Sequence, residues 1–353
     1  MDFFRFLRSD VLSEPAVLVG LIALIGLIAQ KKPVTECIKG TVKTIMGFVI
    51  LGAGASLVVS SLGDFANIFQ HAFGIQGVVP NNEAIVSVAQ KSFGKEMAMI
   101  MFFAMVINIM IARFTPWKFI FLTGHHTLFM SMMVAVILAT AGMTGITLIA
   151  VGSLVVGVAM VFFPAIAHPY MKKVTGSDDV AIGHFSTLSY VLAGFIGSKF
   201  GNKEHSTEDM NVPKSLLFLR DTPVAISFTM SIIFLVTCLF AGADAVKELS
   251  GGKNWFMFSI MQSITFAAGV YIILQGVRMV IAEIVPAFKG ISDKLVPNAR
   301  PALDCPVVFP YAPNAVLVGF LSSFAAGLIG MFTLYLLNMI VIIPGVVPHF
   351  FVG

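Results

Sequence analysis

The chain has 353 residues, of which 58% are hydrophobic and only 11% are charged, and its mean hydropathy is +0.94. Soluble domains carry about 25% charged residues, so this composition excludes a soluble protein and predicts an all-α polytopic membrane protein. The net charge of +4 is no sign of a nucleic-acid partner, and the three scattered cysteines form neither a disulfide framework nor a zinc motif.

Apolar stretches of spanning length follow one another along the chain. In chain order, we expect transmembrane helices at about 15–30, 43–62, 97–112, 119–141, 145–170, 223–242, 255–277 and 314–341. The stretch 181–198 is apolar but shorter, and it contains Gly183, Gly194 and Gly197. It is predicted to be a re-entrant hairpin, whose non-helical backbone must be covered by protein or water.

The basic residues predict an orientation. With the N-terminus outside, most Lys and Arg residues fall on the cytoplasmic side, as the positive-inside bias requires. Lys172, Lys173 and Lys199 then flank 181–198 on one side of the membrane, which supports the hairpin.

The polar run 199–222 would be a cytoplasmic connector. Within it, Ser206 and Asp209 have the spacing of a capping box for a short helix. A solvated connector is the simpler interpretation, and a docking surface for a cytoplasmic partner is the alternative.

Two segments of the chain share an order of features. Val79-Pro80-Asn81 precedes Glu83 in the first, and Val296-Pro297-Asn298 precedes Asp304 in the second. The two loops fall on opposite sides of the membrane, which is typical of inverted-topology repeats in transporters. We therefore expect one transmembrane domain over 1–353, made of repeat one at about 15–170, the hairpin at 181–198, the connector at 199–222 and repeat two at 223–353.

Histidines occur in two otherwise apolar segments, as Gly124-His125-His126 and Gly183-His184. Imidazole is costly in a bilayer, so each histidine should face protein or a water-filled cavity and is a candidate functional residue. The alternative is a buried histidine that donates to a backbone carbonyl. Because adjacent helical residues point in different directions, His126 is a weaker candidate than His125.

Asp304 lies among four prolines, Pro301, Pro306, Pro310 and Pro313. These exclude a regular helix, and a broken apolar segment with one carboxylate is typical of a transport cavity. The alternative is that Asp304 caps a helix or pairs with a nearby arginine. Asn82 and Glu83 occupy the matching place in the first repeat, where an exposed loop acid is the alternative.

A carboxylate, imidazoles and small hydroxyls such as that of Thr127 suit a polar, polyhydroxylated solute. The sequence has no HExxH, Walker, Rossmann or CxxC motif. We therefore expect no cofactor, no metal site, and no redox or ATP-driven activity.

Five blocks of the sequence resemble a known family. They are KGTVKTIMGFVILGAG (39–54), FLTGHH (121–126), IGHFSTLSYVLAGFIGSKFGNKEHSTEDMNVPKSL (182–216), ILQGVRMVIAEIVPAFKGISDKLVPNA (273–299) and LDCPVVFPYAPNAVLVGF (303–320). From about residue 35 onward, the chain resembles the ascorbate-specific IIC permease family of the bacterial phosphoenolpyruvate-dependent sugar phosphotransferase system.

The resemblance implies a homodimer in the lipid of the bacterial inner membrane. Each protomer would have a scaffold and a mobile core that carries the solute as an elevator. A cytoplasmic IIB protein bearing a phosphocysteine would phosphorylate the solute, so the permease would not be an enzyme on its own. Family members usually continue beyond the segment VVPHFF, so the chain is expected to be truncated or a compact variant.

The resemblance places the family's solute site at Asn82, Glu83, His125, Phe129, His184, Phe185 and Asp304. Ascorbate members tend to have Thr-Tyr at 82–83 and Gln at the positions of Phe129 and Phe185, so a related sugar, sugar acid or pentitol is an alternative solute. His126 and Thr127 are added as candidates that can supply the missing hydrogen bonds.

Two other functions fit the same residues. An ion-coupled secondary transporter would carry a proton on Glu83 or Asp304. A polytopic membrane enzyme would use the histidines as a metal or acid–base site.

Overall fold

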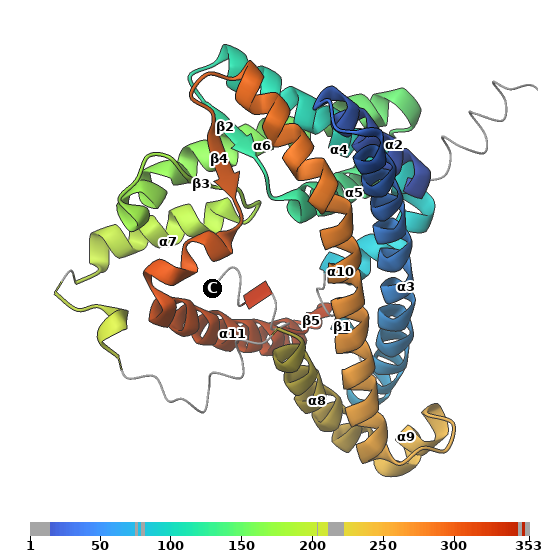
Figure 1. Ribbon diagram of the computed structural model, residues 1–353. Helices are drawn as coiled ribbons and strands as arrows, with labels where there is room; N and C mark the ends of the chain where they lie inside the picture. The colour runs from blue at the N-terminus through green and yellow to red at the C-terminus, as the bar shows by residue number, and fades with distance from the viewer. Residues whose placement is uncertain are drawn as a thin grey trace, which may run out of the picture. The chain divides into compact units, whose positions relative to one another are not determined.

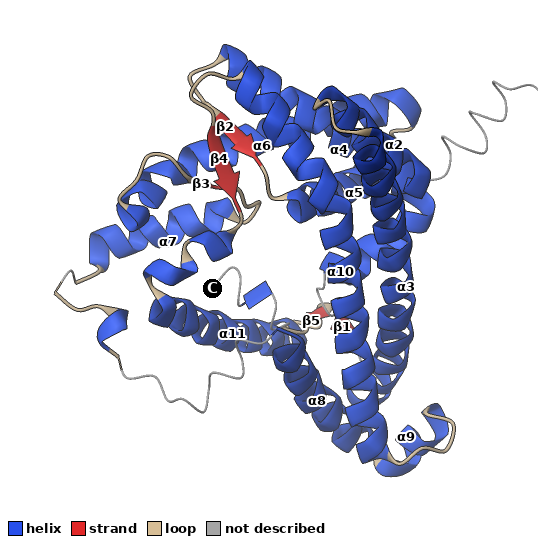
Figure 2. Cartoon of the chain, viewed as in Figure 1, coloured by secondary structure: helices blue, strands red, loops and turns tan. Residues whose placement is uncertain are grey.

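The computed structural model describes residues 15–74, 77–78, 82–202, 204–210, 222–344 and 348–349, and most of these residues are helical (Figure 2). The helices are α2 (Pro15–Ala29), α3 (Val34–Phe73), α4 (Asn82–Phe114), α5 (Gly124–Thr140), α6 (Gly145–Thr175), α7 (Thr187–Phe200), α8 (Thr222–Ala241), α9 (Ala243–Leu249), α10 (Trp255–Leu295) and α11 (Pro313–Leu336). The short strands are β1 (Gly77–Val78), β2 (Phe119–Phe121), β3 (Ala181–Ile182), β4 (Arg300–Leu303) and β5 (Val341–Ile342). Three 3₁₀ turns complete the described elements: η2 (Thr207–Asp209), η4 (Cys305–Val307) and η5 (Phe309–Tyr311).

Within these described ranges, five helices are long and apolar enough to cross a bilayer, namely α3, α4 from Val88, α6, α10 as far as Pro286, and α11. The bent pair of α8 and α9 would be a sixth span if counted as one. The predicted all-α polytopic membrane protein is therefore confirmed at the level of its helices.

Two predicted elements begin differently from expectation. The helix expected over 119–141 is wrong at its start, because Phe119–Phe121 form the buried strand β2 and α5 begins only at Gly124. The stretch 181–198 likewise divides into β3 and the 14-residue helix α7, which is too short to span a bilayer. The strands β2 and β3 both pair with β4, which is far from them in the sequence. Hydrophobic periodicity does not reveal such a pairing.

The chain divides into two compact units. Unit 1 consists of Met1–Leu51, Ala89–Asn202 and Gln275–Tyr311, and unit 2 of Gly52–Val88, Lys203–Leu274 and Ala312–Gly353.

Unit 1 contains a parallel sheet with β4 between β2 and β3 (Figure 1). Ala302 of β4 is in register with Phe121 on one side and Ala181 on the other. Buried Phe119, Ala181 and Ala302 form an apolar cluster against Ala165 of α6. Burial covers these strands with protein, and the ladder hydrogen bonds satisfy their backbone N–H and C=O groups. These are the conditions under which a membrane protein tolerates non-helical backbone.

Asn108 on α4 completes the edge of this sheet. Its amide nitrogen donates to the Phe119 carbonyl at 2.9 Å, and its amide oxygen accepts from the Phe121 N–H at 3.0 Å. One buried side chain thus satisfies both a donor and an acceptor of β2, as a neighbouring strand would.

Unit 2 contains the parallel pair of β1 and β5, in which Gly77 is in register with Val341. In chain order, β1 and β2 flank α4, while β4 and β5 flank α11. Thus β1 pairs with β5, and β4 pairs with β2, so each strand of one segment pairs with a strand of the other.

The connector forms the expected capping box, in which Ser206 and Asp209 cap η2. Its Glu208 carboxylate accepts hydrogen bonds from the Asn314 and Ala315 N–H groups, both at 3.0 Å. Glu208 of the connector therefore caps the N-terminus of α11 from a distant part of the chain. The first N–H groups of a helix have no partner within their own helix, so they are free to bind this carboxylate. Connector residues 211–221 lie outside the described residues.

Candidate functional site

The three parallel strands of unit 1 bring the predicted polar residues together. The carboxyl ends of parallel strands lie at the same edge of a sheet, where ligands commonly bind. Asp304 follows β4 directly, His184 follows β3 by two residues, and His125 lies in the first turn of α5 shortly after β2. Backbone bonds extend the ladder toward this edge, since Leu122 N–H donates to the Ala302 carbonyl at 2.9 Å.

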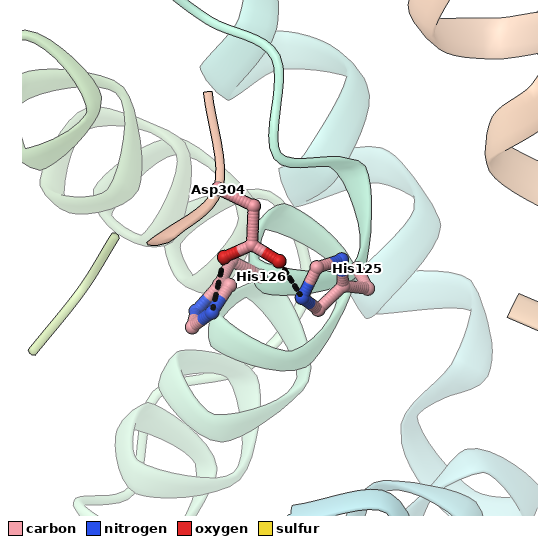
Figure 3. Close-up of side chains that lie close together, drawn as sticks. All are labelled: His125, His126 and Asp304. Atoms are coloured by element: carbon pink, nitrogen blue, oxygen red, sulfur yellow. Dashed lines mark ion pairs between the residues drawn. The ribbon is translucent and has the colours of Figure 1, made fainter. Parts of the chain in front are cut away.

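The Asp304 carboxylate lies between two histidine rings, with one oxygen facing each (Figure 3). Its Oδ2 is 3.3 Å from His125 Nε2, and its Oδ1 is 3.8 Å from His126 Nε2. The ring of His184 lies 3.9 Å from that of His126, measured between centroids. We call these four residues the Asp304 cluster.

His126, the weaker of the two candidates on α5, also reaches Asp304. Both histidines are in the first turn of α5, and the carboxylate enters between their diverging rings. Neighbouring helical residues cannot point in one direction, but they can contact two sides of a group placed between them.

Local hydrogen bonds hold the other members of the cluster. The Ser186 N–H donates to His184 Nδ1 at 3.0 Å, so the neutral ring carries its proton on Nε2. The Thr187 hydroxyl donates to the His184 carbonyl. Asp304 Oδ1 accepts from the Cys305 N–H at 2.8 Å. The orientation of the polar atoms is therefore set by backbone close in sequence.

The glycines of the two Gly-His segments are explained by close packing. A Cβ atom on Gly124 would lie 2.6 Å from Cγ2 of Ile281 on α10. A Cβ atom on Gly183 would lie 2.6 Å from the Ala302 carbonyl oxygen of β4. Both distances are shorter than a real Cβ contact, so only glycine lets the adjacent histidines approach Asp304.

The rings of Phe129 and Phe185 pack against the histidine rings. The Phe129 ring is buried and lies edge-on to His125, with centroids 6.1 Å apart. The Phe185 ring is 6.2 Å from that of His126 and also packs on Phe121 at 5.0 Å. These rings restrict the imidazoles and offer no hydrogen bond to a ligand.

Three other predicted residues are not brought to the cluster by any described contact. Thr127 is buried, and its hydroxyl donates to the Thr123 carbonyl of its own helix at 3.2 Å. Asn82 and Glu83 are the first residues of α4 in unit 2, and their side chains lie outside the described residues. Their role in the site remains a prediction.

The structure adds Cys305 to the candidate site. Cys305 is buried, and its sulfur is near His184 and Asp304. Only its position beside Asp304 in the sequence could have identified it. Thr123, whose hydroxyl the sequence already offers for hydrogen bonding, is buried and has no hydrogen-bond partner among the described atoms.

A second carboxylate cluster lies at the opposite end of β4. Asp178 accepts from His168 Nε2 at 2.8 Å and from the Arg300 guanidinium at 2.5 Å, and Lys172 Nζ lies 3.6 Å away. The hydrogen bond from His168, with the charges of Arg300 and Lys172, lowers the pKa of Asp178 below its ordinary value. We call these four residues the Asp178 cluster. Arg300, which is near Asp304 in the sequence, therefore pairs with Asp178.

The chain matches known proteins along nearly its whole length. The family model described as PTS system sugar-specific permease component (EIIC-GAT) matches residues 10–353. The chain is 27% identical over 384 residues to a curated protein named ascorbate-specific PTS system EIIC component from Mycoplasma pneumoniae, and the match covers 94% of the chain and 57% of that relative. The chain therefore spans little more than half the length of this relative.

The family match and the spanning helices identify a multi-pass protein of the bacterial inner membrane. Proteins of this family are transport components and are not catalytic by themselves, which excludes the membrane-enzyme alternative. The chain belongs to the sugar-specific permease components of the phosphotransferase system.

Proposed function

We propose that the chain translocates ascorbate or a related sugar, sugar acid or pentitol, which a cytoplasmic IIB protein phosphorylates. The observation that carries this proposal is the convergence of one carboxylate and three imidazoles beyond the three parallel strands of a sugar permease. The curated relative is named as ascorbate-specific, which supports the solute class.

The cluster has the chemistry to bind a polyhydroxylated solute. A carboxylate accepts hydrogen bonds from two hydroxyl groups, and a neutral imidazole offers one donor and one acceptor. The side chains of His125, His126 and Asp304 are 28%, 15% and 29% exposed, so their polar atoms are accessible without being fully hydrated. Hydrogen bonds to a solute are stronger in such a partly dehydrated site than in water.

The same groups can assist phosphorylation. As the solute hydroxyl attacks phosphorus, an O–P bond forms, the S–P bond to the IIB cysteine breaks, and the thiolate of that cysteine leaves. An imidazole of the Asp304 cluster accepts the hydroxyl proton. Asp304 stabilises the imidazolium that results, because opposite charges attract strongly at this separation.

The solute preference depends on Phe129 and Phe185. Both positions place an aromatic ring where ascorbate members of the family tend to have an amide. The packed rings of this chain leave recognition to the histidines and Asp304. We therefore expect a preference for solutes that need fewer hydrogen bonds at these two positions than ascorbate does.

The transport cycle is proposed to be of the elevator type, in a homodimer built on inverted repeats. The pairing of β1 with β5 and of β4 with β2 supports the repeat, because the strand before α4 and the strand before α11 each pair with the strand that follows the other helix. Unit 1 carries the Asp304 cluster and is the candidate for the mobile core.

The proposal is tested by a binding screen of ascorbate, sugar acids, hexoses and pentitols on the purified protein. Asp304→Asn keeps the size of the side chain but removes its charge, and it should weaken binding of the preferred solute by at least an order of magnitude. Uptake into vesicles should then require the phosphorylated IIB partner. Unchanged solute affinity in Asp304→Asn would contradict the site, and uptake driven by a proton gradient without IIB would contradict the transport mechanism.

A further inference from the structure

The histidine–carboxylate distances in the two clusters of unit 1 differ. His168 Nε2 is 2.8 Å from Asp178, which is the usual length of a charge-assisted hydrogen bond. His125 and His126 are 3.3 and 3.8 Å from Asp304, beyond the usual range of such bonds. Direct hydrogen bonds to the two imidazoles therefore do not account for the arrangement around Asp304.

The longer distances fit ligands that share a metal ion. With bonds of about 2.0–2.1 Å to imidazole nitrogen and carboxylate oxygen, two ligand atoms of a tetrahedral ion lie about 3.3 Å apart. The His125–Asp304 pair is already at this separation. The His126–Asp304 pair is slightly longer, and one ligand atom from each of His125, His126 and Asp304 lies within 4.8 Å of the others. A small side-chain rotation would complete the geometry.

We propose that His125, His126 and Asp304 bind a divalent transition-metal ion of the zinc type. Two imidazoles and one carboxylate are a common zinc ligand set, and they leave one tetrahedral position for water or another oxygen ligand. Imidazole nitrogen favours Zn²⁺, Co²⁺ or Ni²⁺ over Mg²⁺ and Ca²⁺, which prefer oxygen ligands alone.

The surroundings of these three residues are arranged for such an ion. The Cys305 N–H holds Asp304 Oδ1, and the edge-on ring of Phe129 restricts His125, so two of the ligands are oriented by neighbouring groups. His184 lies against the ring of His126, and with Asp304 and Cys305 it forms a second group of close ligand atoms. A bound cation would also neutralise the Asp304 carboxylate, which is costly at membrane depth.

This metal site goes beyond the proposed function and does not depend on the identity of the solute. Its three ligands are among the groups proposed to bind the sugar, so the ion would lie within the proposed solute site. The additional expectation that two adjacent solute oxygens complete the metal shell does rest on the proposed function.

The test is a metal titration of the full chain, purified in detergent and stripped of metal with a chelator. Calorimetry with Zn²⁺ should give one ion per chain, and Co²⁺ should give the intense visible bands of a tetrahedral site. His126→Gln and Asp304→Asn should each weaken Zn²⁺ binding by on the order of 100-fold or more. Replacing a residue that only hydrogen-bonds a metal ligand already lowers metal affinity by about 10–100-fold.

Two control variants separate this site from adventitious histidines. His168→Gln removes a histidine paired with a carboxylate at hydrogen-bond length, and His349→Gln removes one in unit 2, so both should leave Zn²⁺ affinity unchanged. Equal loss in these controls, no Zn²⁺ binding, or tighter binding of Mg²⁺ than of Zn²⁺ would overturn the proposal. Size-exclusion profiles and helical circular dichroism verify folding, and His125→Gln replaces any variant that misfolds.

The failures of the two proposals are distinguishable. Solute binding that persists in a chelator, with no Zn²⁺ bound on titration, would overturn the metal site alone. Zn²⁺ binding that depends on Asp304, with no sugar, sugar acid or pentitol bound, would overturn the proposed solute site alone.

Discussion

The Asp178 and Asp304 clusters lie at opposite ends of β4. Both contain a carboxylate and at least one histidine, but the contacts of the two carboxylates differ. Asp178 contacts an imidazole, a guanidinium and an ammonium group, and its hydrogen bonds are short. Asp304 contacts imidazoles at longer distances, although its side chain is less exposed (29%) than that of Asp178 (44%). A carboxylate that is fully paired connects elements, whereas one that is loosely paired retains the capacity to bind a ligand.

The ion pair of Asp178 with Arg300 also positions the Asp304 cluster. Arg300 begins β4 and Asp304 follows its end, so about 13 Å of extended strand separates them at roughly 3.3 Å per residue. Asp178 precedes β3 and His184 follows it. The pairing of Asp178 with Arg300 therefore maintains the register of the two strands that carry Asp304 and His184.

The largest expected effect concerns Asp304. Asp304→Asn should weaken binding of the preferred solute roughly 10- to 100-fold, because each hydrogen bond to a charged group contributes about 1.5–3 kcal/mol. The melting temperature should change little, since the carboxylate has no short ion pair among the described residues. Equilibrium binding and thermal unfolding of the same preparation measure both quantities. A variant that unfolds early but binds normally would reverse the roles of the two clusters.

Gly183→Ala should reduce the free energy of unfolding by about 1–3 kcal/mol, the usual cost of forcing a methyl group into a packed region. The added Cβ would press on the Ala302 carbonyl and separate β3 from β4, so solute affinity should fall as well. Gly197→Ala is the matched control, because its Cβ would have nothing within 4 Å and alanine favours a helix. Equal effects of the two changes would show that β3 and β4 need not be in contact.

The Asp178 cluster predicts a pH dependence of stability. Its lowered pKa means that the folded state favours the carboxylate, so the stabilisation is fully present above the ordinary aspartate pKa of about 3.9. It is lost as the pH falls through the lowered pKa of the folded state. Thermal unfolding of the wild type between pH 7 and pH 3 should show this loss, and Asp178→Asn should reduce it. An unchanged acid profile in Asp178→Asn would show that the cluster does not connect the strands.

The smallest expected effect concerns solute choice. Phe185→Gln restores an amide beside His126 and should strengthen ascorbate binding by about 2- to 10-fold, the equivalent of one hydrogen bond of 0.5–1.5 kcal/mol. Phe195→Gln, at an exposed position of α7, is the control for general effects of losing a ring. Competition between ascorbate and the preferred solute measures the change. Weaker ascorbate binding in Phe185→Gln would show that the ring itself contacts the solute.

The sequence by itself determined the membrane class, most of the helices and the broken segment at Asp304. These properties depend on residues close in the chain: apolar runs make spanning helices, prolines interrupt them, and Ser206 with Asp209 caps a turn. The histidines and Asp304 could also be selected as candidates, because polar groups are rare in apolar segments.

Only the tertiary structure decided how these groups meet. Pairing of β2, β3 and β4 joins short apolar runs that are far apart in the sequence and that could equally have continued a helix. That sheet places Asp304 between His125 and His126, whereas the sequence ranked His126 as the weaker candidate. The sheet also pairs Arg300 with Asp178 and places Asp304 beside the imidazoles. Strand register, and not distance along the chain, determines which charged groups are in contact.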